Sequence, residues 1–370
     1  MIPDNAFWRF QNDDFTDVSA NPVLIEVMRG AAVESRHRGA FVVVDASGKI
    51  VHSAGDPRMS IYPRSAVKPL QALPLIETGA ADRFGLTDKE LALACASHKG
   101  EPAHVDAVNA WLDRIGLSDA ALECGIQAPR TPAAAKRAIL AHIPLTAAYH
   151  NCSGKHTGFL TSCVACGDIP SGYIDPNHPA QKRVTQALAE MTSCDLSAVP
   201  VARDGCGVPT YHMPLHSLAT GMARLADPSK LPKARADAAK RLLAAMGAEP
   251  FYVNGTGGFT TEVMATVPSV RLKGGAEGVY AAALPGLGLG MAIKIDDGAA
   301  RAAECAAAHV LRGLGCFGAA EEQRLQAFLN PVIKTDAGRD AGTVRPTAAL
   351  AFAVLLSGTA SYYCSKDRSG

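Results

Sequence analysis

A serine and a lysine stand three residues apart in the segment 64–69, at Ser65 and Lys68. Residues with this spacing share a face of a helical turn, so the hydroxyl and the amine can meet. A serine is a weak nucleophile unless a base takes its proton, and a neutral lysine amine is such a base. The lysine must first lose its own proton, through burial or a neighbouring cation. Ser-x-x-Lys is also common in helices without chemistry, so the motif alone establishes no site.

Two later segments carry residues of the same types. Ser97 lies at the expected end of a helix, and Lys273 precedes two glycines beside an expected strand. Taken alone, the first is a basic helix C-terminus and the second an ordinary turn. In this order the segments parallel the S-x-x-K, S-D-N and K-T-G motifs of penicillin-binding proteins and class A β-lactamases. No asparagine follows at His98-Lys99, and Gly274 replaces the threonine. The parallel therefore describes an architecture and fixes no substrate.

A second group of reactive residues lies in two glycine-rich loops. The first contains Cys152, Lys155 and His156, and the second contains Asp204 and Cys206. Thiolate and imidazole are ligands that zinc prefers, so the residue types favour Cys152, Cys206 and His156 as zinc ligands. A loop with two reduced, buried cysteines explains the same spacing.

The composition limits the class of protein. The chain has 370 residues, of which 48% are hydrophobic and 19% charged, as is typical of a globular protein with a large core. A formal charge of +1 offers no basic surface for nucleic acid, and no apolar run is long enough to cross a membrane. The N-terminus lacks the pattern of a secretory signal. We therefore expect a cytoplasmic protein whose ten cysteines are mostly reduced.

The elements that must position these residues are strands at both ends of the chain and helices between them. An irregular arm is expected over residues 1–20, before the first strand. Strands are expected at 23–28, 40–45 and 49–53, and a helix at 65–76 carries the Ser-x-x-Lys motif. Further helices are expected at 87–96, 103–112, 132–142, 154–166, 178–191 and 233–247. Strands return at 279–284 and 290–295, joined by a glycine-rich hairpin turn, and a helix follows at 298–314.

This order predicts an α/β (α+β) fold with one antiparallel sheet built from N- and C-terminal strands. We expect a single catalytic domain over residues 1–370. An all-helical lobe at roughly 85–255 would be inserted into a sheet lobe formed by about 20–84 and 256–330. The cleft between the lobes is the expected site.

Together, the motifs resemble the rhizobial-type L-asparaginases of the asparaginase II family. The resemblance covers roughly residues 22–330. It rests on Arg-Ser-Ala-Val-Lys-Pro at 64–69, Cys-Ala-Ser-His at 95–98, Asn-Cys-Ser-Gly-Lys-His at 151–156, Asp-Gly-Cys-Gly at 204–207, Lys273 with 275–280, and Lys-Ile-Asp-Asp-Gly at 294–298. It implies a serine β-lactamase-like fold, a homodimer and hydrolysis of L-asparagine to L-aspartate and ammonia.

The resemblance also implies roles for the serines and lysines. Ser65 with Lys68, and Ser97 with Lys273, would form two serine–lysine pairs facing one substrate. We expect Ser65 to attack the amide and form an acyl-enzyme, while Ser97 relays a proton to the leaving ammonia. Arg64 would be a cation that helps to keep Lys68 neutral.

The same resemblance places zinc at Cys152, Lys155 and Cys206. This set differs from the one favoured by residue type, because a lysine replaces His156 and binds metal only as the neutral amine. His156 and Asp204 would then lie beside the metal on the substrate side.

Three alternative functions remain open. A glutaminase on the same fold differs by one methylene of substrate, worth only about 1–3 kcal/mol in a pocket. A β-lactamase or D-alanyl peptidase would require export. A non-catalytic protein that binds zinc or an amino acid would use the same ligands without turnover.

Overall fold

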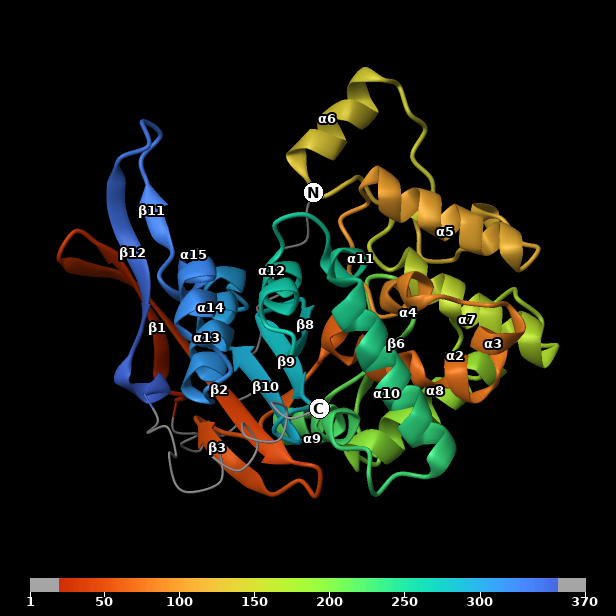
Figure 1. Cartoon of the computed structure of the whole chain (residues 1–370), viewed down its shortest axis with the longest axis horizontal. Helices are drawn as coiled ribbons and strands as arrows, with labels where there is room; N and C mark the ends of the chain where they lie inside the picture. Colours follow the sequence, from red (N-terminus) through yellow and green to blue (C-terminus); the bar gives the residue numbers. More distant parts are fainter. Residues whose placement is uncertain (1–19, 352–370) are drawn as a thin grey trace, which may run out of the picture.

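The computed structural model describes residues 20–351, which form a mixed α/β fold with a curled antiparallel sheet beside many helices (Figure 1). Within these residues the sheet has the strand order β11-β12-β1-β2-β10-β9-β8, and β3 also pairs with β2. The strands of this sheet are β1 (Val23–Arg29), β2 (Ala32–Asp45), β3 (Ile50–Ala54), β8 (Arg271–Gly275), β9 (Val279–Leu284), β10 (Leu289–Ile295), β11 (Val332–Lys334) and β12 (Asp340–Pro346).

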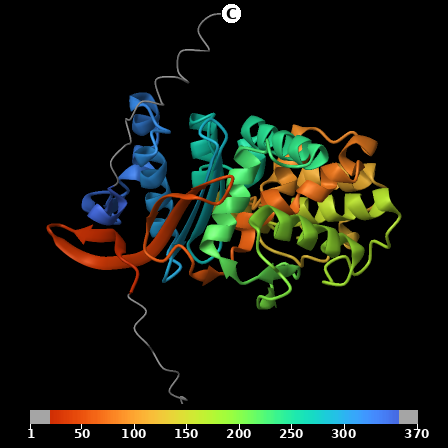
Figure 2. The ribbon, with the colours of Figure 1, turned by 90° about the horizontal axis from the view of Figure 1, so that it is seen from below.

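The long strand β2 joins the two halves of the sheet. Its first half pairs with β1, and its second half pairs with both β10 and β3. The second half begins with the apolar run 40–44, which is buried, as expected for a strand covered on both faces. Helix α9 (Leu215–Ala226) packs on β10 and β2, and α13 (Ala300–Gly313) packs on β12, β10 and β9 from the other side (Figure 2).

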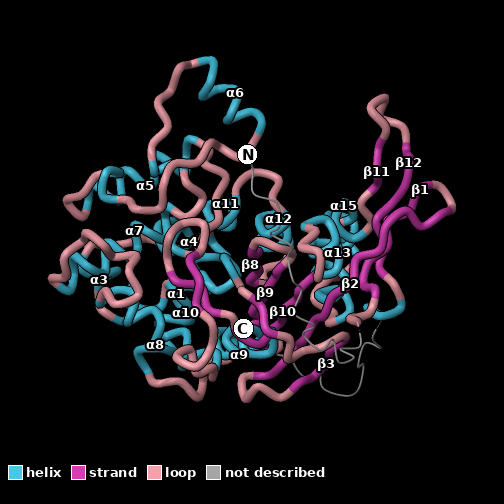
Figure 3. The backbone as a smooth tube through the Cα atoms, turned by 180° about the vertical axis from the view of Figure 1, so that it is seen from behind, coloured by secondary structure: helices cyan, strands magenta, loops and turns pink. Residues whose placement is uncertain are grey.

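The remaining helices form a group at the end of the molecule opposite the projecting strands β1, β11 and β12, with α12, α14 and α15 nearer the sheet (Figure 3). One continuous hydrophobic core extends from the sheet into this group. The helices are α1 (Lys68–Gln71), α2 (Leu73–Glu77), α3 (Ala80–Arg83), α4 (Asp88–Ala94), α5 (Pro102–Arg114), α6 (Pro132–Leu140), α7 (Ser153–Cys166), α8 (Pro179–Thr192), α10 (Lys233–Ala248), α11 (Pro250–Asn254), α12 (Phe259–Thr266), α14 (Ala319–Arg324) and α15 (Gln326–Leu329).

Short elements complete the described chain. The 3₁₀ helices are η1 (Arg64–Val67), η2 (Asp119–Ala121), η3 (Ala147–Tyr149) and η4 (Ala348–Leu350). Two small two-stranded sheets pair β4 (Ser60–Ile61) with β7 (Met213–Pro214) and β5 (Val201–Arg203) with β6 (Pro209–Tyr211). The stretch expected to be all-helical therefore also contains strands, and its helix α9 packs on the sheet.

Most of the expected elements are present with shifted ends. The strand expected at 40–45 begins eight residues earlier, at Ala32. The single helix expected at 65–76 is instead divided into η1, α1 and α2. Pro69 and Pro74 explain the division, because proline has no N–H and restricts the residue before it. The Lys273-Gly274 segment, expected to be a turn, belongs to strand β8. The arm expected at 1–20 lies outside the described residues except at residue 20.

Two expectations about the environment of the protein can be compared with the structure. No helix between residues 20 and 351 is long and apolar enough to cross a membrane. The nine cysteines in the same range form no disulfide with one another, and the expected reduced state stays a prediction.

Candidate active site

A cleft of about 430 Å³ lies between β8, η1, the loop after α4 and the start of α12. Ser65 and Ser97 both line it, although 31 residues of chain separate them. Strand β8 is at the end of the sheet, so its outer edge is not paired with another strand, and its Gly274 and Gly275 line the cleft. The cleft therefore combines two hydroxyl groups with the backbone of an edge strand.

The turn that carries Ser65 has an unusual backbone. Arg64 has φ +51°, a left-handed conformation that costs energy for a residue with a side chain. Its Nε donates to Asp204 Oδ1 at 2.6 Å, which holds the turn against the β5–β6 loop. Asp204 therefore pairs with the guanidinium of Arg64 and ties it to the turn, while the expected effect of Arg64 on Lys68 stays a prediction.

Strand β8 touches the Ser65 turn directly. A Cβ built on Gly275 would lie 2.6 Å from the carbonyl oxygen of Pro63 and 3.2 Å from the backbone nitrogen of Ala66. Only glycine permits so close an approach of two backbones. The position of Ser65 is therefore fixed by the sheet edge as well as by its own helical turn.

Ser97 is the meeting point of two buried lysines. Lys68 Nζ donates to Ser97 Oγ at 3.0 Å, and Lys273 Nζ donates to the same oxygen at 2.8 Å. Lys68 also donates to the carbonyl oxygen of Ala96 and to Cys152 Sγ. These three acceptors use all three N–H bonds that a lysine ammonium has.

The expected hydrogen bond between Ser65 and Lys68 is absent from the described part of the chain. The spacing on a helical turn allows that contact, but the amine of Lys68 instead donates to Ser97 and to two buried acceptors beside it. The structure thus brings Lys68, Ser97 and Lys273 into one hydrogen-bonded group and leaves the hydroxyl of Ser65 open to the cleft.

The amine of Lys273 is suited to accept a proton. Burial lowers its pKa well below the ordinary lysine range, and the neighbouring charge of Lys68 lowers it further. A neutral amine is thereby favoured at a hydrogen-bond distance from Ser97. Lys273 can therefore act as a base toward Ser97.

A second buried cluster contains Cys152, Lys155 and Cys206. Lys155 Nζ donates to Cys206 Sγ at 3.1 Å. The hydrogen bond with Cys206 holds the pKa of the Cys152 thiol well below its usual range against the effect of burial, and the amines of Lys68 and Lys155 lower it further. Burial alone would lower the pKa of Lys155, but the two sulfurs outweigh burial and raise it.

These three residues would offer two sulfurs and one amine to a zinc ion, which suits the ligand preference of the ion. Among residues 20–351 there is no group of three His, Cys, Asp or Glu arranged to hold a metal, so three protein ligands at this place would have to include the amine of Lys155. Metal binding would release protons from these groups.

His156 lies deep in the protein beside this cluster. Its Nδ1 is 2.6 Å from the hydroxyl of Tyr173, whereas its buried Nε2 has no hydrogen-bond partner among the described residues. Burial lowers the pKa of the imidazole well below its usual range. Among the residues described, the lining of the cleft includes neither His156 nor Asp204 nor Arg64.

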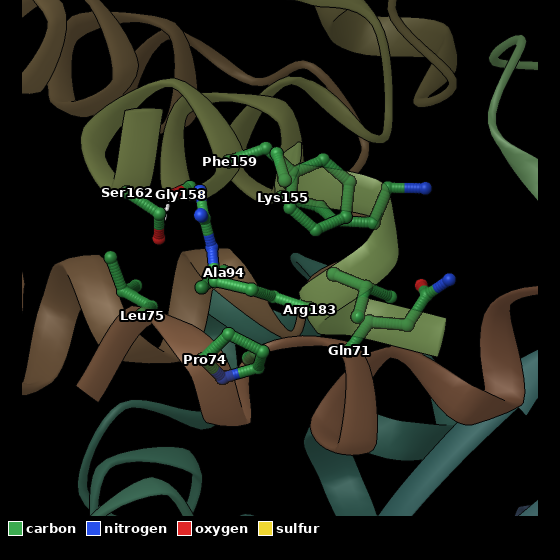
Figure 4. A pocket seen from close by; sticks show the side chains of 12 residues that line it. Gln71, Pro74, Leu75, Ala94, Lys155, Gly158, Phe159, Ser162 and Arg183 are labelled. Atoms are coloured by element: carbon green, nitrogen blue, oxygen red, sulfur yellow. Dashed lines mark hydrogen bonds between the residues drawn. The ribbon is translucent and has the colours of Figure 1, made fainter. Parts of the chain in front are cut away.

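A small cavity of about 10 Å³ lies between α1, α2, α7 and α8, with Lys155 and Phe159 on one side and Gln71 and Pro74 on the other (Figure 4). It shares no lining residue with the cleft. Its volume suits about one water molecule, so it is too small for an amino-acid substrate.

A protein-family model matches most of the chain. The model of the L-asparaginase II family matches residues 25–346. The chain belongs to the L-asparaginase II family. A search among curated proteins found no match. Membership in the L-asparaginase II family supports an amide-hydrolysing enzyme with a small-molecule substrate. The matched range extends from β1 to β12 and includes both serines of the cleft.

Several residues that line the cleft were missed by sequence reasoning. Asn254 donates from its side chain to the carbonyl oxygen of Ser97 at 3.2 Å. The glycine-rich stretch that follows it is the sequence feature that could have indicated a place in the site. Arg130 and Glu304 also line the cleft. Each stands alone in the sequence, without a motif, so only the tertiary structure reveals them.

Proposed function

We propose that this protein is an L-asparaginase that hydrolyses L-asparagine to L-aspartate and ammonia. Two observations support the proposal: membership in the L-asparaginase II family, and the contact of two buried lysine amines with Ser97 in the cleft that also exposes Ser65. The second observation carries the chemistry, because it supplies a hydroxyl nucleophile, a neutral base and a path for protons.

In the proposed mechanism, the neutral amine of Lys273 takes a proton from Lys68 through the hydroxyl of Ser97. Lys68 then accepts the proton of Ser65, whose oxygen attacks the side-chain amide carbon of asparagine. The lowered pKa of Lys273 and the contacts of Ser97 with both amines support this relay. Side-chain rotation must bring the amine of Lys68 to Ser65, since that amine is hydrogen-bonded to Ser97 in this structure.

The developing negative charge on the amide oxygen needs hydrogen-bond donors. In η1 the N–H of Ala66 already donates to the carbonyl oxygen of Pro63 at 3.1 Å. The N–H of Ser65 has no such partner among the described contacts, as is usual for the first residues of a helical turn, and it lies where η1 meets the edge of β8 at Gly275. We assign the oxyanion hole to this junction. Collapse of the tetrahedral intermediate breaks the C–N bond, with a proton from Lys68 passing through Ser97 to the departing nitrogen. Water then attacks the aspartyl ester of Ser65 and gives up a proton to Lys68. The bond between the acyl carbon and Ser65 Oγ breaks, Lys68 returns the proton to Ser65 Oγ, and aspartate leaves.

Zinc would be held by Cys152, Lys155 and Cys206. When bound, it supplies a fixed positive charge that orients groups near it. The residues that would hold it do not line the cleft among the described residues, and Cys152 contacts Lys68. The contact between Cys152 and Lys68 thus connects the zinc site to the lysine relay. His156 and Asp204 lie in the region around that site.

Ammonia release from asparagine by Ser65→Ala and Ser97→Ala variants tests the assignment. Ser65→Ala should lose about 10³-fold or more of turnover, and Ser97→Ala about 10²- to 10⁴-fold. Mass spectrometry of the slowed Ser97→Ala variant should find the aspartyl group on Ser65. Near-full turnover by Ser65→Ala would transfer the nucleophile's role to Ser97, an alternative favoured by the contact of both amines with Ser97.

Comparison of substrates separates the alternative functions. Faster turnover of glutamine than of asparagine would identify a glutaminase. Hydrolysis of a chromogenic cephalosporin would favour a β-lactamase. A rise in melting temperature with asparagine, but without ammonia release, would favour a binding protein.

We also propose a serine β-lactamase-like fold with a single catalytic domain made of a sheet lobe and an inserted helical lobe. The Ser-x-x-Lys segment facing an edge strand that carries Lys273 supports this proposal. A homodimer in the cytoplasm is proposed from the family resemblance. Light scattering of the purified protein tests the dimer.

A further inference from the structure

Glu304 is an unpaired acid on the wall of the cleft. It projects from α13, lines the same cleft as Ser65 and Ser97, and is partly buried. Its Oε1 accepts a hydrogen bond from the hydroxyl of Tyr280 at 3.2 Å, but no cation forms an ion pair with it among residues 20–351. Burial raises the pKa of this carboxyl group, and the hydrogen bond from Tyr280 and the charge of Lys99, which lines the same cleft, only partly offset that effect. A buried carboxylate without a directly paired cation is unfavourable, so a positively charged ligand group in contact with it would stabilise it.

Arg130 is the complementary feature of the same cleft. It is exposed at the cleft, and its backbone nitrogen donates to the carbonyl oxygen of Lys99 at 2.8 Å, which ties it to the loop after Ser97. No carboxylate within the described residues pairs with its guanidinium. Arginine binds carboxylates with two parallel hydrogen bonds, so this cation suits a carboxylate ligand.

A chain of contacts connects Glu304 to the lysine relay. Tyr280 stands opposite Gly274 across β8 and β9. A Cβ built on Gly274 would lie 3.1 Å from the hydroxyl oxygen of Tyr280, and the carbonyl oxygen of Gly274 accepts a hydrogen bond from Lys273 at 2.7 Å. The acid therefore stands beside the strand that carries Lys273, within the same cleft as the reacting groups.

We infer that Glu304 and Arg130 bind the two charged groups of a free amino-acid substrate, the α-ammonium group at Glu304 and the α-carboxylate at Arg130. The inference rests on the proposed amide hydrolysis and assigns the two residues that recognise the head group of its substrate. A zwitterion satisfies both unpaired charges at once, whereas an amide lacking either group leaves one of them unpaired. Glu304 and Arg130 are thus specificity-determining residues, and the enzyme discriminates against amides without an amino-acid head.

Two asparagine analogues test each charge separately. Succinamate is asparagine without its α-amino group, and β-alaninamide is asparagine without its α-carboxylate. For Glu304→Gln, kcat/KM with asparagine should fall about 10- to 100-fold, mainly through KM, with succinamate changed by less than about twofold. For Arg130→Met, the same loss should appear with asparagine and succinamate but not with β-alaninamide. Equal losses with every amide would overturn the inference, because they indicate a general structural effect.

Matched controls exclude effects of charge alone. Glu262→Gln on α12 and Arg137→Met on α6 remove the same charges from residues that do not line the cleft, and both variants should keep wild-type kcat/KM for all three amides. Thermal unfolding should show that all four variants are folded.

A binding measurement separates this inference from the proposed reaction. Calorimetric titration with asparagine should show affinity falling about 10- to 100-fold in Glu304→Gln and in Arg130→Met. If the wild type binds asparagine but releases no ammonia, and both variants bind it more weakly, the reaction is wrong and the head-group assignment stands. If the wild type does not bind asparagine, or if both variants bind it as well as the wild type, the assignment is wrong.

Discussion

Replacing Gly275 with alanine should disturb the Ser65 turn by a calculable amount. The new Cβ would lie 2.6 Å from the carbonyl oxygen of Pro63, whereas ordinary van der Waals contact begins at 3.4 Å. The carbonyl oxygen of Pro63 is a backbone atom and cannot rotate away as the end of a side chain could. The turn or the strand must therefore move by about 0.8 Å to relieve the contact. A misplacement near 1 Å at a reacting group costs about 10²-fold in rate, and the added methyl costs about 1–3 kcal/mol of stability.

Ammonia release measured at saturating and limiting asparagine checks this prediction. Gly275→Ala should show kcat reduced by about 10- to 100-fold while urea unfolding remains cooperative. Gly286→Ala is the matched control. It makes the same change in the β9–β10 turn, where the nearest atom to a new Cβ is 4.0 Å away, and it should keep the wild-type rate. A folded Gly275→Ala variant with wild-type kcat would show that contact with β8 does not position Ser65.

Two further predictions concern Lys273 and the metal. Lys273→Met should lower ammonia release by about 10²- to 10⁴-fold and should flatten the dependence of unfolding free energy on pH. Because burial and Lys68 depress the pKa of Lys273 in the folded chain, the unfolded chain binds a proton that the folded chain lacks, so this lysine makes stability rise with pH by up to about 1.4 kcal/mol per unit until about pH 10.4. Urea unfolding at several pH values measures the slope, and an equal slope in the variant would contradict a depressed pKa. Chelation of zinc should raise KM for asparagine more than it lowers kcat, and loss of turnover with asparagine binding intact would refute an orienting role for the metal.

Periodicity and turn chemistry were sufficient to predict most elements of the fold. The capping box at Thr87 and Glu90 correctly marked the start of α4, and the strands β9 and β10 were expected within one residue of their ends. Strand β8 was missed because Gly274 and Gly275 have low strand propensity. Its pairing with β9 decides its conformation, and single-sequence patterns do not contain that information.

For the candidate site, the sequence predicted that Lys68, Ser97 and Lys273 lie together, as the structure shows, but it did not predict all of their contacts. Ser65, Ser97 and the lysines were selected from spacing and family resemblance. Helical geometry predicted a Ser65–Lys68 contact, whereas the amine of Lys68 follows acceptors supplied by distant parts of the chain. Glu304 escaped notice because nothing near it in the sequence distinguishes it from an ordinary helical glutamate. Its partial burial and its hydrogen bond with Tyr280 distinguish it, and these are visible only in the tertiary structure.

The pairing of β2 with β10 is delayed while the chain is being synthesised. Its second half reaches Asp45, but its partner β10 begins at Leu289, so the ribosome must add about 240 residues before that edge can close. At typical elongation rates this takes about 10–50 s. Throughout that interval the apolar run 40–44 has an open hydrogen-bonding edge, which favours association with other nascent chains. Lys273 also emerges late, so Ser65, Lys68 and Ser97 are synthesised long before the amine that would complete their proposed proton relay.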